Sequence, residues 1–426
     1  MSSPHGAELS FFSTVPRPGL QTRAFAIAVY ANLVSAPSHP DLATLTSPKG
    51  APVHLRHLPT PSLLLDEARL RRNIARLDER LRVPGVVLRP HCKTCKSMDV
   101  ARLCMASPQG PITVSTLAEA EYFAEHGVTD ICYAVGVTPG KLARALALRQ
   151  RGIRLSLLLD SAEGARLLAA FARERKHIFD LLLEIDCDGH RSGLRPDDPE
   201  LTESAALLAG AGQNLLGVLT HAGSAYDLPA PGPEVFAALA GQERDAAVRA
   251  AQRLREAGHA CPVVSVGSTP TAFYGEDFTG VSEVRAGVYM FQDLVMAGLG
   301  VCRPEDIALS VLCTVIGRRK DSGNLVADAG WMALSRDTGL PGRFVREGYG
   351  LVCDADGKPL PGLRVAETNQ EHGIIAACEG QCPPLPVGTL LRILPVHACA
   401  TAAAFDAYHV CRGQEITAVW SRCRGW

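Results

Sequence analysis

The stretch ITVSTLAEAEYFAEHGVTDICYAV, residues 112–135, decides how the rest of the chain is interpreted. It begins with the apolar run Ile112–Val114, continues through a helical pattern over Leu117–His126 and ends in a second apolar run, Ile131–Val135. A strand, a helix and a strand in this order predict two parallel strands joined by a crossover helix. Because both runs are mainly apolar, we expect strands that are buried on both faces.

The same alternation extends along the chain on both sides of this stretch. Further helical patterns cover Lys141–Arg151, Ala162–Arg175 and Glu234–Ala257. This alternation over ~200 residues matches an α/β fold of the (β/α)8 TIM-barrel type, and an open, doubly wound parallel sheet is the alternative. The expected strands are Val86–Leu88, Ile112–Val114, Ile131–Val135, Leu155–Leu159, Leu181–Ile185, Leu215–Leu219, Val263–Val266 and Val284–Phe291.

The pattern changes on either side of the expected barrel. Residues 1–55 are rich in Ser, Pro and Gly and predict an irregular N-terminal extension, residues 56–295 the barrel, and residues 296–426 an all-β C-terminal domain. Short strand-like pieces separated by turns support the last assignment. They are Ala308–Ile316, Leu325–Ala327, Gly373–Cys378, Leu390–Leu394 and Glu415–Trp420.

Composition excludes several classes of protein. With 47% hydrophobic and 20% charged residues, the chain is neither disordered nor a coiled coil, and a net charge of -1 argues against a nucleic-acid partner. The apolar run Ala24–Ala31 is too short to span a membrane, although with Arg23 it weakly resembles a targeting segment. The 14 cysteines are scattered rather than arranged as a disulfide scaffold, which indicates a reducing, cytoplasmic setting.

Residues that carry chemistry follow the expected strands, where a barrel places its active site. Lys93 comes just after the first strand, in Arg89-Pro90-His91-Cys92-Lys93-Thr94. Partial desolvation there makes an amine nucleophilic and suited to a Schiff base, and a solvated loop lysine is the alternative. Gly267-Ser268-Thr269 suggests a phosphate cradle or a plain turn. Further strand-end candidates are Arg191, His221, Arg285, Gly287 and Tyr289.

Two cysteine-containing motifs raise the possibility of a metal site. His397 and Cys399 follow the apolar run Leu390–Leu394, and on a strand two such residues share a face, so imidazole and thiolate suit Zn²⁺. A core cysteine beside a turn histidine is the alternative. Cys92 and Cys95 have the spacing of a redox or metal pair, but no second pair lies at metal-ligand spacing.

Together, these residues in this order resemble the fold-type III pyridoxal-phosphate enzymes, and within them the D-serine dehydratase and D-threonine aldolase family. The resemblance covers about residues 58–410 and begins at Thr60–Asp66, which is similar to the family's opening strand. Residues 89–94 resemble its Pro-His-x-Lys-Thr signature, which contains His91 and makes Lys93 the implied Schiff-base lysine.

The resemblance also implies roles for the other candidates. It places Arg191 near the phenolic oxygen of the cofactor, stacks His221 on the pyridine ring and sets Arg285 facing the pyridine nitrogen. Gly267, Ser268 and Thr269, with Gly287, resemble the phosphate site, and His397 with Cys399 resembles the family's zinc pair. Gly223–Tyr226 keeps the family's tyrosine, Tyr226, whereas Cys95 and Val396 replace the usual histidine and asparagine.

The function implied is a dehydratase of a 3-hydroxy D-amino acid such as D-serine, dependent on pyridoxal 5'-phosphate and zinc. The alternative is an aldolase that yields glycine and an aldehyde; dehydratases of this family tend to carry His-x-Cys, and aldolases His-x-Asp. A racemase would leave the zinc pair without a task, and non-catalytic pyridoxal-phosphate carriers usually lack a β domain. The resemblance further implies a small-molecule substrate and a homodimer.

Overall fold

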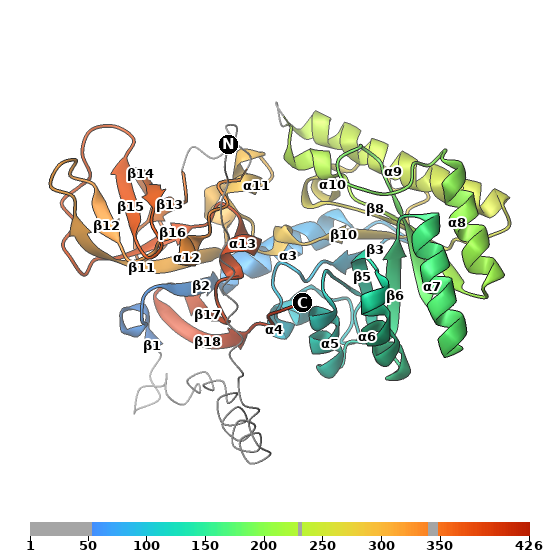
Figure 1. Cartoon of the computed structure of the whole chain (residues 1–426). Helices are drawn as coiled ribbons and strands as arrows, with labels where there is room; N and C mark the ends of the chain where they lie inside the picture. Colours follow the sequence, from blue (N-terminus) through green and yellow to red (C-terminus); the bar gives the residue numbers. More distant parts are fainter. Residues whose placement is uncertain (1–52, 229–231, 340–347) are drawn as a thin grey trace, which may run out of the picture. The chain divides into compact units, whose positions relative to one another are not determined.

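The computed structural model describes residues 53–228, 232–339 and 348–426. Two β structures form this part of the chain, with helices on the outside of one of them (Figure 1). The expected N-terminal extension lies outside the described residues up to residue 52. None of the helices in the described ranges combines the length and apolar character that a membrane span requires.

The first structure is a closed parallel barrel. Its strands are ordered β3-β10-β9-β8-β7-β6-β5-β4, every pairing is parallel, and a parallel bridge between His91 and Thr113 closes the ring between β3 and β4. This closure rules out the open, doubly wound sheet. The strands are β3 Val87–Pro90, β4 Ile112–Val114, β5 Asp130–Gly136, β6 Arg154–Leu159, β7 Asp180–Ile185, β8 Asn214–Thr220, β9 Val263–Val266 and β10 Glu283–Ala286.

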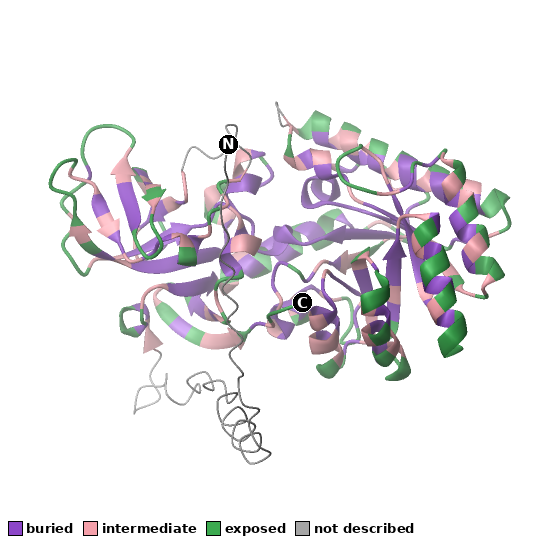
Figure 2. Cartoon of the chain, viewed as in Figure 1, coloured by how far each residue is buried: buried purple, intermediate pink, exposed green. Residues whose placement is uncertain are grey.

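The longer helices cover the outside of the barrel and bury one face each, so that Figure 2 shows green outer surfaces over purple strands. Side chains cap several of them; Thr116, for example, accepts a hydrogen bond from the backbone N–H of Glu119 at the start of α5. The helices are α3 Glu67–Arg80, α4 Met98–Cys104, α5 Leu117–Glu125, α6 Pro139–Gln150, α7 Ala162–Arg175, α8 Pro199–Gly210, α9 Pro233–Glu256, α10 Thr269–Tyr274 and α11 Leu294–Gly298.

The interior of the barrel has an apolar and a polar side. Cys132, Leu158, Leu182 and Leu219 form an apolar cluster from β5 to β8. On the opposite side, charged groups of β3 and β10 are paired, and the Arg89 guanidinium lies 2.8 Å from a carboxylate oxygen of Glu283. The strands of the polar side end where several of the expected site residues lie.

The second structure is antiparallel except for one pairing. Strand β16 pairs with both β13 and β11, which closes the strands β11-β12-β15-β14-β13-β16 into a small barrel. From β11 the sheet continues through β2, β17, β18 and β1. Within the described residues, the one parallel strand pair of this sheet is β17 with β2. The strands are β1 Val53–His54, β2 Ser62–Asp66, β11 Leu309–Arg318, β12 Leu325–Ala327, β13 Leu351–Cys353, β14 Pro359–Thr368, β15 Gly373–Ala377, β16 Leu390–Leu394, β17 Ala407–Arg412 and β18 Glu415–Ser421.

Three differences from the sequence-based expectations concern the borders. The eighth apolar run is a strand only to Ala286, because the chain then turns into a 3-10 helix over Val288–Met290. The expected barrel range 56–295 begins with β2, yet β2 pairs with β11 and so belongs to the β domain's sheet. The segment with His397 and Cys399, which was expected to continue as a strand, instead leads into a short helix, α13 Ala398–Ala402.

Candidate active site

A cavity of about 410 Å³ opens where the barrel loops meet the β domain. Barrel residues reach it from the loops after β3, β7, β8, β9 and β10, as a TIM-barrel site requires. The β domain contributes residues from the start of α13 and from the segment after α12 Trp331–Leu334. All the expected site residues except Tyr289 line it: His91, Lys93, Arg191, His221, Tyr226, Gly267, Ser268, Thr269, Arg285, Gly287, His397 and Cys399.

Tyr289 does not belong to the site. Because β10 ends at Ala286, the following 3-10 helix turns the Tyr289 side chain into the core, where it is fully buried beside the Cys104 thiol. Burial raises the pKa of its hydroxyl well above the ordinary value. The expectation that Tyr289 contacts a cofactor is therefore not supported by its position.

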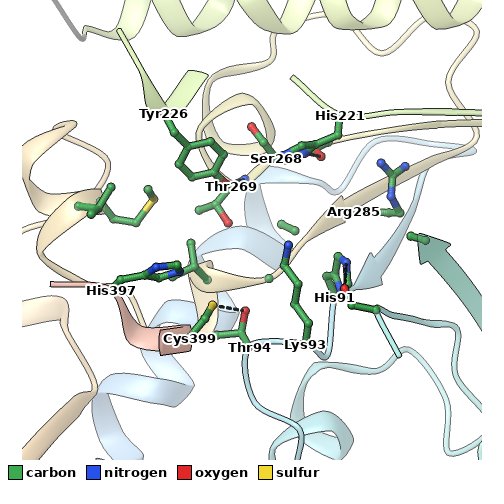
Figure 3. A pocket seen from close by; sticks show the side chains of 18 of the residues that line it. His91, Lys93, Thr94, His221, Tyr226, Ser268, Thr269, Arg285, His397 and Cys399 are labelled. Atoms are coloured by element: carbon green, nitrogen blue, oxygen red, sulfur yellow. Dashed lines mark hydrogen bonds between the residues drawn. The ribbon is translucent and has the colours of Figure 1, made fainter. Parts of the chain in front are cut away.

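Lys93 supplies the amine of the cavity. Its side chain extends from the turn after β3 toward the middle of the pocket (Figure 3). Lys93 is exposed rather than partly desolvated as expected, because its side chain reaches into the open cavity. Lys96, three residues on, does not line the cavity, since its amine lies 2.9 Å from a carboxylate oxygen of the buried Glu119.

Two histidines near Lys93 are held in the neutral form. Burial, assisted by the charges of Lys93 and Arg285, lowers the pKa of His91 well below its ordinary value. Burial likewise lowers the pKa of His221 to about 3, against a raising contribution from its hydrogen bond to Gly267. His221 Nδ1 lies 3.0 Å from that carbonyl, so Nδ1 carries the proton and donates it there.

Arg285 is anchored by the barrel wall. Its guanidinium donates to the Thr220 carbonyl at the end of β8 and to the Ser265 hydroxyl of β9. Burial lowers the pKa of Arg285 from its ordinary value. Arg191, in contrast, has a side chain that is 55% exposed, and it contacts Glu184 at 3.4 Å. Arg285 is therefore held in place within the cavity, and Arg191 lies at its rim.

The Gly267–Thr269 loop has donors that point in two directions. The Gly267 N–H donates to Glu243 and the Ser268 N–H donates to Thr271, so these two amides are engaged within the protein rather than free for a phosphate. The buried Thr269 hydroxyl has no hydrogen-bond partner among the described residues. The Thr269 N–H lies 3.4 Å from the Tyr226 hydroxyl. Thr269 is therefore the group that this loop presents to the cavity, next to Tyr226 from the loop after β8.

His397 and Cys399 come together, though not as expected. They are not on a strand: His397 is the N-cap residue of α13, and Cys399 lies in the first turn of that helix. Burial acts to lower the pKa of His397, but its hydrogen bonds to Asp337 and to Cys399 raise it to about 11. The pKa of Cys399 is shifted the other way, since burial would raise it but His397 and Lys93 lower it.

Three further residues of the cavity wall were not among the site residues expected from the sequence. Asp337 Oδ2 lies 2.6 Å from His397 Nδ1, which leaves Nε2 of that ring for another partner. Asp293 accepts the Ala398 N–H at 3.0 Å and so fixes the start of α13. The Thr94 hydroxyl contacts the Cys399 sulfur at 3.3 Å (Figure 3). Only Thr94 had a sequence signal, since it follows Lys93.

The residues present fit a phosphorylated aldehyde cofactor and a metal ion. A free amine, two neutral histidines and a buried unpartnered hydroxyl converge on one cavity. The backbone approaches closely at Gly287, where a Cβ would lie 2.9 Å from the Thr94 hydroxyl oxygen. For the metal, the described residues contain no cluster of three or more His, Cys, Asp or Glu ligands. The His397–Cys399 pair therefore gives an incomplete shell, as catalytic rather than structural sites do.

Two known protein families match the chain, one in each half. The family "Alanine racemase, N-terminal domain" matches residues 65–294, and the family "Putative serine dehydratase domain" matches residues 308–411. These matches cover the barrel and most of the β domain.

Characterised relatives match over nearly their full lengths. D-threo-3-hydroxyaspartate dehydratase from Delftia sp. (strain HT23) is 51% identical, over 87% of this chain and 98% of its own. Its solved structure superposes with a TM-score of 0.85 at 50% identity, over 88% of this chain and 100% of its own, and a cysteine-to-alanine variant of it has been solved in a metal-free form. D-serine dehydratase from Dictyostelium discoideum is 30% identical, over 84% of this chain and 94% of its own.

The similarity extends to aldolases at lower identity. The structure of D-threonine aldolase from Filomicrobium marinum has a TM-score of 0.72 at 25% identity, over 88% of this chain and 98% of its own. The fold is thus shared between dehydratases and aldolases.

Proposed function

Because the chain belongs to the D-serine dehydratase-like family of fold-type III pyridoxal-phosphate enzymes, we propose that it removes water from a 3-hydroxy D-amino acid and releases a keto acid and ammonia. The observation that carries this proposal is the meeting of Lys93 with the His397–Cys399 pair in one cavity. A lysine alone would suit many reactions of amino acids. The nearby donor pair adds the means to act on a β-hydroxyl group.

Lys93 would hold pyridoxal 5'-phosphate, with Thr269 and Gly287 toward its phosphate, His221 against its ring, and Arg285 and Arg191 near its ring nitrogen and phenolic oxygen. When bound, this cofactor withdraws electrons from the Cα of an amino acid and makes its proton acidic. The chain's own contribution is then to position the amino acid and to move the proton. The Lys93 amine, which reaches into the cavity, would be the group that accepts the Cα proton after the amino acid has taken its place.

His397 and Cys399 would hold a zinc ion. The Asp337 hydrogen bond to Nδ1 directs Nε2 of His397 toward the ligand position, and the lowered pKa of Cys399 favours the thiolate. Zinc there supplies Lewis-acid assistance to departure of a β-hydroxyl group. The soft thiolate suits zinc better than it suits magnesium or calcium.

Product analysis tests the proposed function directly. Purified protein with pyridoxal phosphate and zinc is incubated separately with D-serine, D-threonine and D-threo-3-hydroxyaspartate. We expect keto acid and ammonia from at least one of them, with no reaction of the L-enantiomers. Glycine and an aldehyde as the main products would instead establish an aldolase, and racemised substrate alone would refute both.

We also propose a homodimer in a cytoplasmic, reducing setting. Support for the dimer is the resemblance to this fold type, in which the β domain of one subunit helps to close the barrel mouth of another. Val135, which is 39% exposed at the cavity wall, is an apolar residue that such a partner would cover. All 14 cysteines are free thiols, as expected in a reducing compartment. Light scattering after gel filtration measures the subunit number.

A further inference from the structure

A buried carboxylate behind the cavity contacts two of its loops without lining it. Glu243 lies midway along α9, the long outer helix that packs against β8 and β9 (Figure 1). Glu243 is 2% exposed, whereas Glu234 on the same helix is exposed. A carboxylate so deeply buried is costly unless both of its oxygens are hydrogen-bonded.

Both oxygens of Glu243 are satisfied, by groups from separate loops. Oε1 accepts the Ala222 N–H at 2.8 Å and the Gly267 N–H at 3.0 Å. Oε2 lies 2.8 Å from the Thr271 hydroxyl oxygen. Ala222 follows His221 after β8, and Gly267 follows β9. One side chain from the outer layer therefore links the loop of His221 to the loop expected to meet a phosphate.

The contact to Thr271 extends to the next residue of that loop. The Ser268 N–H donates to the Thr271 hydroxyl oxygen at 3.0 Å, and the two hydroxyl oxygens lie 2.9 Å apart. With the amides of Gly267 and Ser268 drawn inward, the loop presents the unpartnered Thr269 hydroxyl to the cavity. Glu243 thus determines which donors face the cavity and which face the core.

We propose that Glu243 is a positioning residue that shapes the Gly267–Thr269 loop for the phosphate of the cofactor, an inference that rests on the proposed function. It touches neither the cofactor nor the substrate and acts through Gly267 and Thr271.

An amide at this position does not reproduce the arrangement. In Glu243→Gln, the carbonyl oxygen can still accept the two N–H groups, but the NH2 group then faces the Thr271 hydroxyl. The Thr271 hydroxyl then loses Glu243 Oε2 as its acceptor and must donate its hydrogen toward Ser268 instead. A hydrogen placed there disturbs the bonds that Thr271 now makes with the Ser268 N–H and hydroxyl groups. Glu243→Gln is therefore a change of hydrogen-bond polarity at nearly constant shape.

The test compares two aldehydes that differ only in the phosphate. Cofactor-free wild type, Glu243→Gln and the matched control Glu234→Gln are titrated with pyridoxal phosphate and with pyridoxal, and binding is followed by absorbance. We expect Glu243→Gln to lose about tenfold in affinity for pyridoxal phosphate, the usual scale for a disturbed buried hydrogen bond, and clearly less for pyridoxal. Glu234→Gln should match the wild type for both.

Thr271→Val provides a second variant if Glu243→Gln does not fold, which circular dichroism and thermal unfolding will show. It removes the hydroxyl that connects Glu243 to Ser268 and should give the same preferential loss for the phosphorylated aldehyde. An equal loss for both aldehydes, or no loss, overturns the positioning role. A wild type that binds neither aldehyde refutes the cofactor site itself, which distinguishes failure of the proposed function from failure of this inference.

Discussion

The two walls of the cavity are built in different ways. On the barrel side, the site residues come from the ends of separate strands, and the buried Arg285 is anchored by its neighbours β8 and β9. On the β-domain side, His397 and Cys399 come from a single short segment that donates hydrogen bonds to the carboxylates of Asp337 and Asp293. The barrel therefore offers a rigid binding surface, and the β domain offers one small donor group.

This division implies that binding of the cofactor and direction of the reaction are separable. Residues that would hold the cofactor lie on the barrel, and the pair that would assist loss of a hydroxyl group lies on the β domain. The two walls meet where the Thr94 hydroxyl touches the Cys399 sulfur, one residue from Lys93. Substitutions on one wall should leave the function of the other measurable.

The largest expected effect is on the barrel wall. Lys93→Ala should abolish turnover, because the same amine would bind the cofactor and take up the Cα proton. Borohydride reduction of the loaded wild type followed by peptide mapping should place the adduct on Lys93. Lys96 is the internal control, since its amine is paired with Glu119, and an adduct on Lys96 would overturn the assignment.

The next effect belongs to the β-domain wall. Cys399→Ala, or removal of metal by a chelator, should lower the dehydration rate at least ~100-fold, because Lewis-acid assistance contributes several kcal/mol to the barrier. Cofactor absorbance, thermal stability and exchange of the Cα proton with solvent should persist, since these depend on the barrel wall. The matched control is Cys378→Ala, an exposed thiol of the β domain. Full activity of the metal-free protein would make the His397–Cys399 pair structural.

The barrel wall was also the more predictable of the two. Each of the eight expected strands is present, because apolar runs such as Leu181–Ile185 are long enough to be distinguished from the helical patterns between them. Once the strands are known, the strand-end rule locates residues such as His221 and Arg285. The rule failed for Tyr289, because the apolar residues after Ala286 continue the pattern of a strand although the chain turns at Gly287.

The β domain was predicted less well for a physical reason. Strands β14 and β17 were missed, since they mix polar and apolar residues on a sheet with one solvated face. Strand β13 was missed because it is only three residues long. Asp337 is 60 residues from His397 along the chain, and no local pattern connects the two. His397 and Cys399 were identified as a pair from a strand geometry that the structure replaces with the first turn of a helix.

A smaller effect is expected at the support of the metal pair. Asp337→Asn should lower zinc affinity about tenfold or more, because the carboxylate that orients the His397 ring and raises its basicity is lost. Competition with a chromophoric chelator measures this affinity, and Asp321→Asn, which alters an exposed carboxylate of the same domain, is the control. Unchanged affinity would show that Asp337 does not support the metal site. Pyridoxal-phosphate affinity should stay the same in both variants.

The smallest expected effect sharpens the role of the barrel wall. The Thr269 hydroxyl is buried without a hydrogen-bond partner among the described residues, so the cofactor-free protein gains nothing from it. Thr269→Val, which keeps the shape of the side chain, should therefore leave the thermal midpoint of the cofactor-free protein unchanged or slightly raised. Affinity for pyridoxal phosphate should fall about threefold to tenfold, the net worth of one ordinary hydrogen bond. Thr269→Ser keeps the hydroxyl and should retain the affinity. If Thr269→Val binds pyridoxal phosphate as tightly as Thr269→Ser does, the phosphate lies elsewhere on the barrel wall.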